Sequence, residues 1–153
     1  MNALSALALL TQINVSRVLN AVAAGTSDQN SSSVDMAGYE GVLFVALFGT
    51  LTATQVTSIK AQSSSDDGST DTFADLEGTA VGPLTDSDGN KMLLLDVFRP
   101  DERYVRCVVD RGTANAVIDG VIAIRYGARS IPTTQGSTVM AAESHVSPAE
   151  GTA

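Results

Sequence analysis

The feature that most constrains the fold is an unbroken apolar run, VLFVALF, at residues 42–48. A run of this length and composition is typical of a strand that is buried on both faces. Residues 55–62 alternate instead, which predicts an antiparallel strand with one face in the core and the other in solvent. The inner face is expected to carry Thr57, Ile59 and Ala61, and the outer face Ser58, Lys60 and Gln62.

Turn signals divide the rest of the chain into further short strands. Residues 63–69 (SSSDDGS) and 86–90 (DSDGN) each contain an Asp-Gly pair, which is typical of hairpin or loop tips. Strands are predicted at residues 72–76, 91–98, 104–110 and 116–126, with Gly120 as a candidate β-bulge in the last of them.

Several short strands separated by turns predict an all-β fold, an antiparallel β-sandwich of the jelly-roll-like or Ig-like kind with about six to eight strands. With 153 residues, of which 44% are hydrophobic, the chain can bury one core without metals or disulfides, and a second domain is not expected.

Three parts are expected along the chain: an N-terminal arm and loop at residues 1–33, the sandwich at 34–131, and an extended C-terminal tail at 132–153. Residues 3–10 favour a short helix or packing arm, whereas the apolar spacing in residues 13–24 fits a helix and a strand equally well. The tail is small and polar, with little to bury.

Charge and hydropathy exclude two kinds of partner. The chain has 17 acidic and 9 basic residues, a net charge of -8, which argues against a nucleic-acid surface. Residues 1–10 are apolar, but they lack a positive flank and fall short of the ~20 residues that cross a bilayer. Synthesis in the cytoplasm is therefore expected, without secretion or membrane insertion.

The residue types that usually carry nucleophilic catalysis do not occur in an arrangement that would activate a nucleophile. The single cysteine, Cys107, lies in an apolar run and is expected to be a buried small hydrophobe. The single histidine, His145, lies in the tail, which is a poor place to hold a general base. We therefore expect no enzyme and no catalytic residue.

Acidic loop residues raise the alternative of a metal site. Asp86, Asp88 and Asn90 alternate like the start of an EF-hand loop, but Lys91 stands where that loop needs glycine, and Val97 stands where it needs glutamate. Residues stabilising a tight turn are the simpler interpretation. The acids at 66, 67, 71 and 75 are expected in solvated loops, so neither a metal nor a cofactor is expected.

Four arginines form the candidate protein interface: Arg99, Arg103, Arg106 and Arg111. Acidic residues are interleaved among them at 101, 102 and 110, so one interpretation is a set of weak surface ion pairs around a turn. The other is an arginine-rich contact surface for an acidic neighbour, because the planar guanidinium suits interface recognition.

Four segments together resemble small phage and prophage structural proteins that are encoded close to the major capsid protein. They lie at residues 35–49, 61–79, 95–111 and 122–132. The shared pattern comprises Gly-Tyr-Glu-Gly at 38–41 before an apolar strand, Ser-Asp-Asp-Gly at 65–68, and Arg-Tyr-x-Arg at 103–106.

This resemblance implies a capsid decoration or cement protein on the virion surface. Its partners would be the major capsid protein and further copies of itself, as a dimer or trimer, with both chain ends bridging capsomers. The alternatives are a phage tail or head-completion component and a glycan-binding sandwich. The glycan-binding alternative is disfavoured, because the chain has no tryptophan and only three tyrosines for sugar stacking. No catalytic residue carries over.

Overall fold

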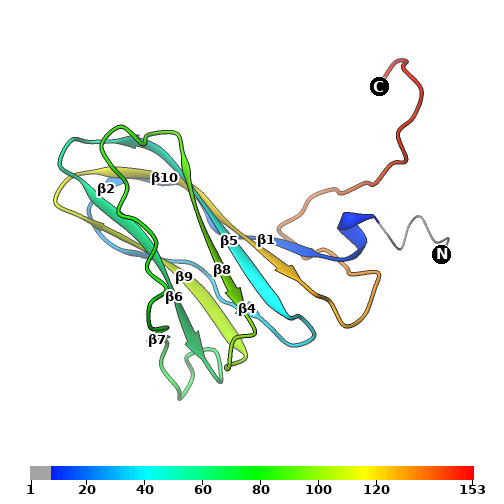
Figure 1. Cartoon of the computed structure of the whole chain (residues 1–153), viewed down its shortest axis with the longest axis horizontal. Coiled ribbons are helices and arrows are strands. Elements are labelled where there is room, and N and C mark those ends of the chain that lie inside the picture. Colours follow the sequence, from blue (N-terminus) through cyan, green and yellow to red (C-terminus); the bar gives the residue numbers. More distant parts are fainter. Residues whose placement is uncertain (1–7) are drawn as a thin grey trace.

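The computed structural model describes residues 8–153, and these residues form two antiparallel sheets packed face to face (Figure 1). This arrangement confirms the predicted all-β sandwich. The helical structure of the described part is one short 3-10 turn, η1 (Leu9–Thr11), so most of the helix predicted at 3–10 lies outside the described residues. Residues 8–153 contain no helix of the length and apolar character that crossing a membrane requires.

Sheet A, as we name it, has the strand order β1-β10-β5-β8, with β2 also paired to β10. Its strands are β1 (Asn14–Leu19), β2 (Val22–Gly25), β5 (Gly41–Leu51), β8 (Met92–Phe98) and β10 (Ala116–Tyr126). Sheet B has the order β3-β9-β6-β7, with β4 also paired to β9. Its strands are β3 (Gln29–Asn30), β4 (Val34–Asp35), β6 (Val56–Ser64), β7 (Ala74–Asp75) and β9 (Tyr104–Gly112).

All the strands predicted after residue 41 are present. The bulge is also confirmed, because the register of β10 on β5 shifts between Ile118 and Gly120, and Gly120 has a φ of 152°. The structure has more strands in residues 8–153 than the six to eight expected, since β1 to β4 all precede residue 41, and β3 and β4 have only two residues each. Such short strands lack the alternation that sequence analysis detects.

The expected boundary before Val34 needs correction. Strands β1 and β2 pair with β10, and β3 pairs with β9, so residues 14–30 belong to the sandwich rather than to an N-terminal arm. The apolar spacing of residues 13–24 did not choose between helix and strand. Pairing with β10, a strand some hundred residues later in the chain, makes these residues strands.

The first part of the C-terminal tail is also attached to the sandwich. The side chains of Gln135 and Thr138 accept hydrogen bonds from the backbone N–H groups of Val15 (2.7 Å) and Arg17 (3.1 Å) on β1. The Thr133 hydroxyl donates to the carbonyl of residue 13 at 2.6 Å. The tail therefore covers the outer edge of β1 with side chains, whereas residues 140–153 are all exposed.

The core lies between the inward faces of the sheets. On β6, Thr57, Ile59 and Ala61 have no exposed surface, as the alternation predicted. Cys107 on β9 is also fully buried, and burial raises the pKa of its thiol to about 12. The largest fully buried side chains, Phe44 and Phe48, both come from the apolar run on β5.

Two inward-pointing arginines join the sheets at opposite ends of the sandwich. Arg111 on β9 donates to the carbonyls of Ala23 (3.0 Å) and Ala116 (2.7 Å) in sheet A. Arg125 on β10 donates to the carbonyl of Asp35 on β4 at 2.6 Å. These guanidinium groups give the carbonyls at the two ends of the apolar core a charged hydrogen-bond donor.

Replacing the buried guanidinium should destabilise the fold. In Arg111→Met the side chain keeps its length, but the acceptor carbonyls lose their donor, so we expect the free energy of unfolding to fall by about 2 to 4 kcal/mol. Arg99→Met is the control, because the Arg99 side chain is 72% exposed and its ion pair should contribute less than about 1 kcal/mol. Urea unfolding measures both; equal losses would contradict the role assigned to Arg111.

Candidate interaction surface

The outer face of sheet A is apolar, which is unusual for a sheet face that residues 8–153 leave largely uncovered. We call this surface the apolar face. Three of its side chains are more than half exposed: Met92 (53%), Leu94 (51%) and Phe98 (59%), all on β8. Its half-buried members are Val15, Leu43, Val45, Leu47, Ile122 and Ile124.

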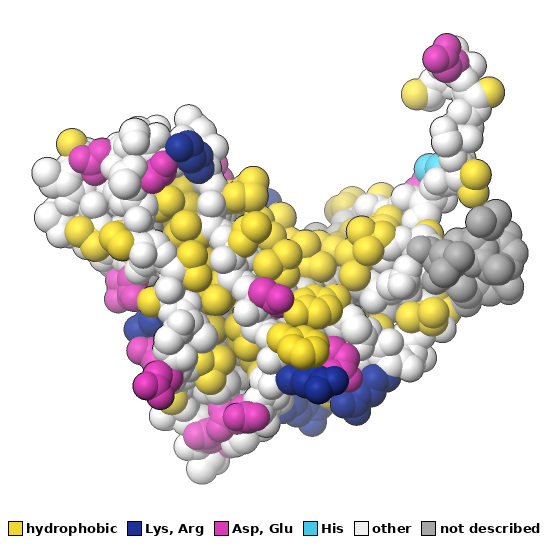
Figure 2. Space-filling model, in the orientation of Figure 1, with side chains coloured by type: hydrophobic (Ala, Val, Ile, Leu, Met, Phe, Trp, Pro, Cys, Tyr) yellow, Lys and Arg dark blue, Asp and Glu magenta, His cyan; other side chains and the backbone are white. Residues whose placement is uncertain are grey.

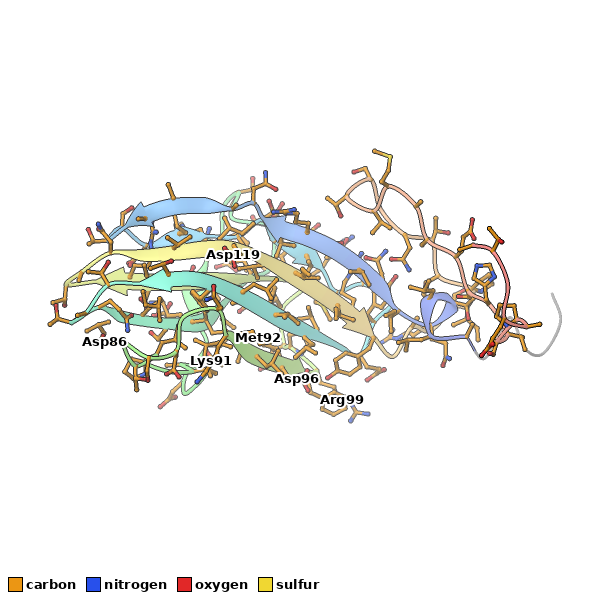
Figure 3. All side chains as sticks on the ribbon, turned by 90° about the horizontal axis from the view of Figure 1, so that it is seen from above. Asp86, Lys91, Met92, Asp96, Arg99 and Asp119 are labelled. Carbon is orange, nitrogen blue, oxygen red and sulfur yellow. The ribbon has the colours of Figure 1, made fainter. Side chains whose placement is uncertain are left out.

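Strand register makes these side chains neighbours. Val45 on β5 lies opposite Leu94 on β8 and Ile122 on β10, and Leu47 lies opposite Met92. Hydrophobic side chains accordingly form a band across the molecule in Figure 2. Seen from above in Figure 3, Met92 lies on the β8 side of the sheet and the carboxylate of Asp119 lies over β10. The apolar face therefore continues across at least three strands.

The apolar run on β5 explains this face. Its inward side chains at 42, 44, 46 and 48 are at most 1% exposed, but those at 43, 45 and 47 are only half-buried. The prediction that both faces of this strand are buried is therefore wrong for the single chain. The run of apolar residues on both sides of β5 nevertheless indicated the apolar face, because such a strand is expected to be covered on both sides and residues 8–153 cover only one.

The first part of the C-terminal tail reaches the apolar face. Val139 lines a groove of about 280 Å³ together with Val15, Leu47 and Ile122. The tail thus closes the β1 side of the face, and the β8 side stays uncovered by residues 8–153.

A single hydrogen bond places a polar group among these apolar side chains. The Tyr126 hydroxyl on β10 donates to Asp96 Oδ1 on β8 at 2.6 Å. The tyrosine ring crosses over Gly41 on the intervening strand, where a Cβ atom would lie 2.4 Å from the ring. Only glycine fits at this position. Burial, followed by the hydrogen bond to Asp96 and its charge, raises the pKa of Tyr126 to about 12.

The two edges of sheet A differ. The Lys91 carbonyl accepts a hydrogen bond from Phe48 N–H (3.0 Å), and Arg99 N–H donates to the Glu40 carbonyl (2.8 Å). In an antiparallel pair every second residue bonds to the neighbouring strand, so the backbone N–H and C=O groups of odd-numbered β8 residues point toward β5. Those of Met92, Leu94, Asp96 and Phe98 point to the outer edge, where the described chain offers them no partner. The β8 edge is therefore open, whereas the tail covers the β1 edge.

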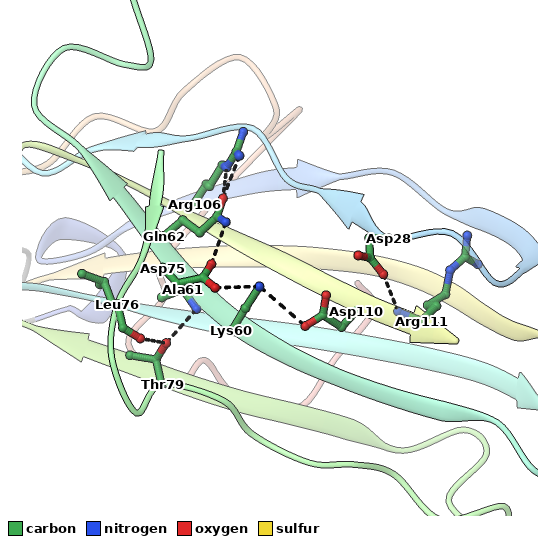
Figure 4. A network of polar contacts seen from close by, with 10 residues as sticks. All are labelled: Asp28, Lys60, Ala61, Gln62, Asp75, Leu76, Thr79, Arg106, Asp110 and Arg111. Atoms are coloured by element: carbon green, nitrogen blue, oxygen red, sulfur yellow. Dashed lines mark hydrogen bonds and ion pairs between the residues drawn. The ribbon is translucent and has the colours of Figure 1, made fainter. Parts of the chain in front are cut away.

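The outer face of sheet B is polar, in contrast to the apolar face (Figure 4). The Gln62 amide donates to Asp75 (2.7 Å), and its oxygen accepts from Arg106 (2.7 Å). Lys60 forms ion pairs with Asp75 (2.9 Å) and Asp110 (3.9 Å). Side chains on this face therefore satisfy one another and can remain in solvent.

The four arginines of the candidate interface do not form one surface. Arg111 is only 6% exposed, so it is not available as an interface residue. Arg106 lies on the outer face of sheet B, over the ring of Phe73. The two are five residues apart on β9, and side chains an odd number apart point to opposite faces of a strand.

The other two arginines line one hollow of about 540 Å³ at the end of the sandwich. Arg103 forms two hydrogen bonds with the Asp35 carboxylate (2.9 and 2.8 Å), and Arg99 pairs with Glu40 (3.1 Å). Arg103 lowers the pKa of Asp35 through these bonds. Both arginines thus form surface ion pairs, but their partners come from distant segments, so the interpretation that they pair with the interleaved acids is wrong for these two.

The acidic loops act as turns. The Asp66 carboxylate accepts backbone N–H bonds from residues 69 (3.0 Å), 70 (2.8 Å) and 71 (3.1 Å), and Asp88 binds Thr85 and Lys91. Among residues 8–153, no group of three or more His, Cys, Asp or Glu side chains is placed to hold a metal ion. His145 pairs with Glu143 in the exposed tail.

No protein-family model matches this chain, and no curated protein matches its sequence. A functional proposal therefore depends on the geometry of the surface and on the sequence motifs.

The hydrogen bond on the apolar face gives a pH-dependent prediction. A raised pKa means that the folded chain holds the Tyr126 proton more tightly than the unfolded chain. Its contribution to stability is complete below pH 10 and is lost as the pH rises toward about 12. In Asp96→Asn we expect the pKa of Tyr126 to fall toward 10 without reaching it, because burial is the largest cause.

Ultraviolet absorbance of the phenolate measures this pKa, with Tyr126→Phe subtracted as the baseline. Asp119→Asn removes another carboxylate from the same sheet face and should leave the pKa of Tyr126 unchanged. If the pKa of Tyr126 is unchanged in Asp96→Asn, the hydrogen bond between the two side chains does not form.

Proposed function

We propose that this chain is a non-enzymatic structural subunit whose apolar face binds another protein surface, and that it decorates the outside of a phage capsid. The observation that carries the proposal is the difference between the two outer faces. Sheet B has a polar outer face, whereas sheet A presents Met92, Leu94 and Phe98 to solvent.

Contiguous apolar patches on soluble chains commonly mark contact surfaces. Covering the exposed half of one of these three side chains contributes about 1 kcal/mol. Such a contact is weak by itself, but it is repeated many times on a shell and gains from avidity. A subunit that binds the assembled shell and not its free components stabilises the shell by mass action.

The phage-like motifs support the capsid part of the proposal through their structural roles. Gly41 of the Gly-Tyr-Glu-Gly motif makes room for Tyr126. Asp67 and Gly68 of the Ser-Asp-Asp-Gly motif both have positive φ, as a tight turn requires. Arg103 of the Arg-Tyr-x-Arg motif binds Asp35. Proteins that share the motifs are expected to share these contacts and the sandwich.

The exposed tail suits a bridging role. Residues 140–153 span roughly 45–50 Å when fully extended, at 3.3–3.6 Å per residue. That length reaches across a neighbouring subunit, so a decorating copy is able to contact more than one capsomer.

Substitution on the apolar face should weaken capsid binding. Leu94→Lys places a charge within the face, and we expect capsid binding to fall at least about tenfold, since burying an unpaired charge is costly. Val56→Lys is the matched control, because Val56 is also 51% exposed but lies on sheet B. Co-sedimentation with purified capsids lacking the protein measures both variants. Equal binding by both would contradict the assignment of the face.

Quantitative mass spectrometry of the virion tests the capsid role itself. Decoration predicts a simple ratio of copies to the major capsid protein, and shells lacking the protein should break at lower temperature or lower ionic strength. A few copies per particle would favour a tail or head-completion component. Absence from the virion would overturn the capsid role and leave glycan binding to be tested.

A further inference from the structure

We propose that the open edge of β8 binds residues 140–147 of a second copy, which add to sheet A as an antiparallel strand. The inference deepens the proposed role as an assembly subunit and rests on it, but it concerns contacts between identical chains. It is tested with the purified protein alone, so its failure is distinguishable from a failure of capsid binding.

The β8 edge has the features of a strand-addition site. Four of its residues direct backbone N–H and C=O groups outward, and three of these carry the most exposed side chains of the apolar face. Unpaired edges of this kind bind extended segments through main-chain hydrogen bonds, and flanking side chains add specificity. The occupant is thus an extended segment with one apolar face.

The tail contains such a segment. Residues 137–147 contain neither glycine nor proline, and the exposed residues 140–147 are long enough to pair with the whole of β8. In an extended conformation Met140, Ala142, Ser144 and Val146 share one face, and Ala141, Glu143 and His145 share the other. Met140 is 98% exposed and Val146 73% exposed, so the apolar side chains of the tail lack a cover of their own. Pro148 ends the segment, because it has no N–H to donate.

The tail of the same chain lies elsewhere. Its residues 133–138 cover the edge of β1, which is at the opposite side of sheet A from β8. From there the tail leaves the sandwich beside η1 and extends away from β8, as Figures 1 and 3 both show. A second copy is therefore the source that the geometry favours.

Charge complementarity favours the tail over a second β8 strand. Lys91 and Arg99 flank β8, with side chains 63% and 72% exposed, and each has one acidic partner in its own chain, Asp88 and Glu40. In the antiparallel register that pairs two β8 strands fully, Lys91 would lie opposite Arg99, and like charges in this position are destabilising. When Met140 and Val146 of the tail extend the apolar face, Glu143 lies on the opposite side of the sheet, which is the side of Lys91 and Arg99.

The geometry of a β-strand allows a test that compares proline at an even-numbered and at an odd-numbered residue of the tail. With Met140 and Val146 on the apolar face, antiparallel pairing directs the N–H groups of even-numbered tail residues toward β8. Ser144→Pro removes one of these donors, whereas His145→Pro removes an N–H that points away. Both positions lie in the exposed tail, so neither substitution disturbs the core.

Sedimentation equilibrium over a range of concentrations measures self-association. We expect the unaltered chain to self-associate, Ser144→Pro to weaken association about tenfold for the lost hydrogen bond, and His145→Pro to stay within about twofold. Equal effects of the two prolines, or a chain that remains monomeric, would overturn the proposal.

Amide hydrogen exchange locates the contact. The amides of Leu94 and Asp96 should become protected as concentration rises, and Ser144→Pro should shift this protection to about tenfold higher concentrations. Those of Leu93 and Leu95 bond to β5 and should be protected at all concentrations. Protection of Leu94 and Asp96 that does not depend on concentration would place the chain's own tail on β8 and rule out a second copy as the occupant.

Discussion

The structure depends on packing between the inward faces of two antiparallel sheets. Phe44 and Phe48 from β5 meet Ile59 from β6 and Val109 from β9, and all are at most 1% exposed. A core of this kind has polar backbone at both ends, which must be satisfied without solvent. Arg111 and Arg125 meet this requirement by donating to carbonyls from the opposite sheet. The sandwich is thus apolar in its middle and closed by cations at its ends.

Once the core is formed, each sheet has an outer face, and the two faces are used differently. Polar side chains on sheet B hydrogen-bond to one another, so that face tolerates water. Sheet A instead repeats the apolar character of its inner face on its outer face. Because the hydrophobic effect is roughly proportional to buried apolar area, a partner that covers sheet A stabilises the pair, whereas sheet B offers little gain. The same asymmetry distinguishes the edges: the tail covers β1, and the described chain leaves β8 open.

Much of the fold follows from local pattern. Period-two alternation placed β6, and glycine placed the bulge in β10. The candidate interface was less predictable, because its four arginines are close in sequence but lie in three different places in the fold. The partners of Arg103 and Arg99, which are Asp35 and Glu40, come from segments some sixty residues away. The contact between Tyr126 and Asp96 was missed for the same reason, although the glycine at 41 marked a close approach.

The sequence by itself determined where strands and turns occur after residue 41, that Cys107 is buried, and that residues 42–48 are apolar on both sides. These properties depend on neighbours along the chain, which sequence periodicity records. Only the tertiary structure decided that residues 14–30 join the sandwich, that Arg111 points inward, and that β8 is an edge. Each depends on which distant strands pair, and a strand's own pattern specifies its faces but not its neighbours.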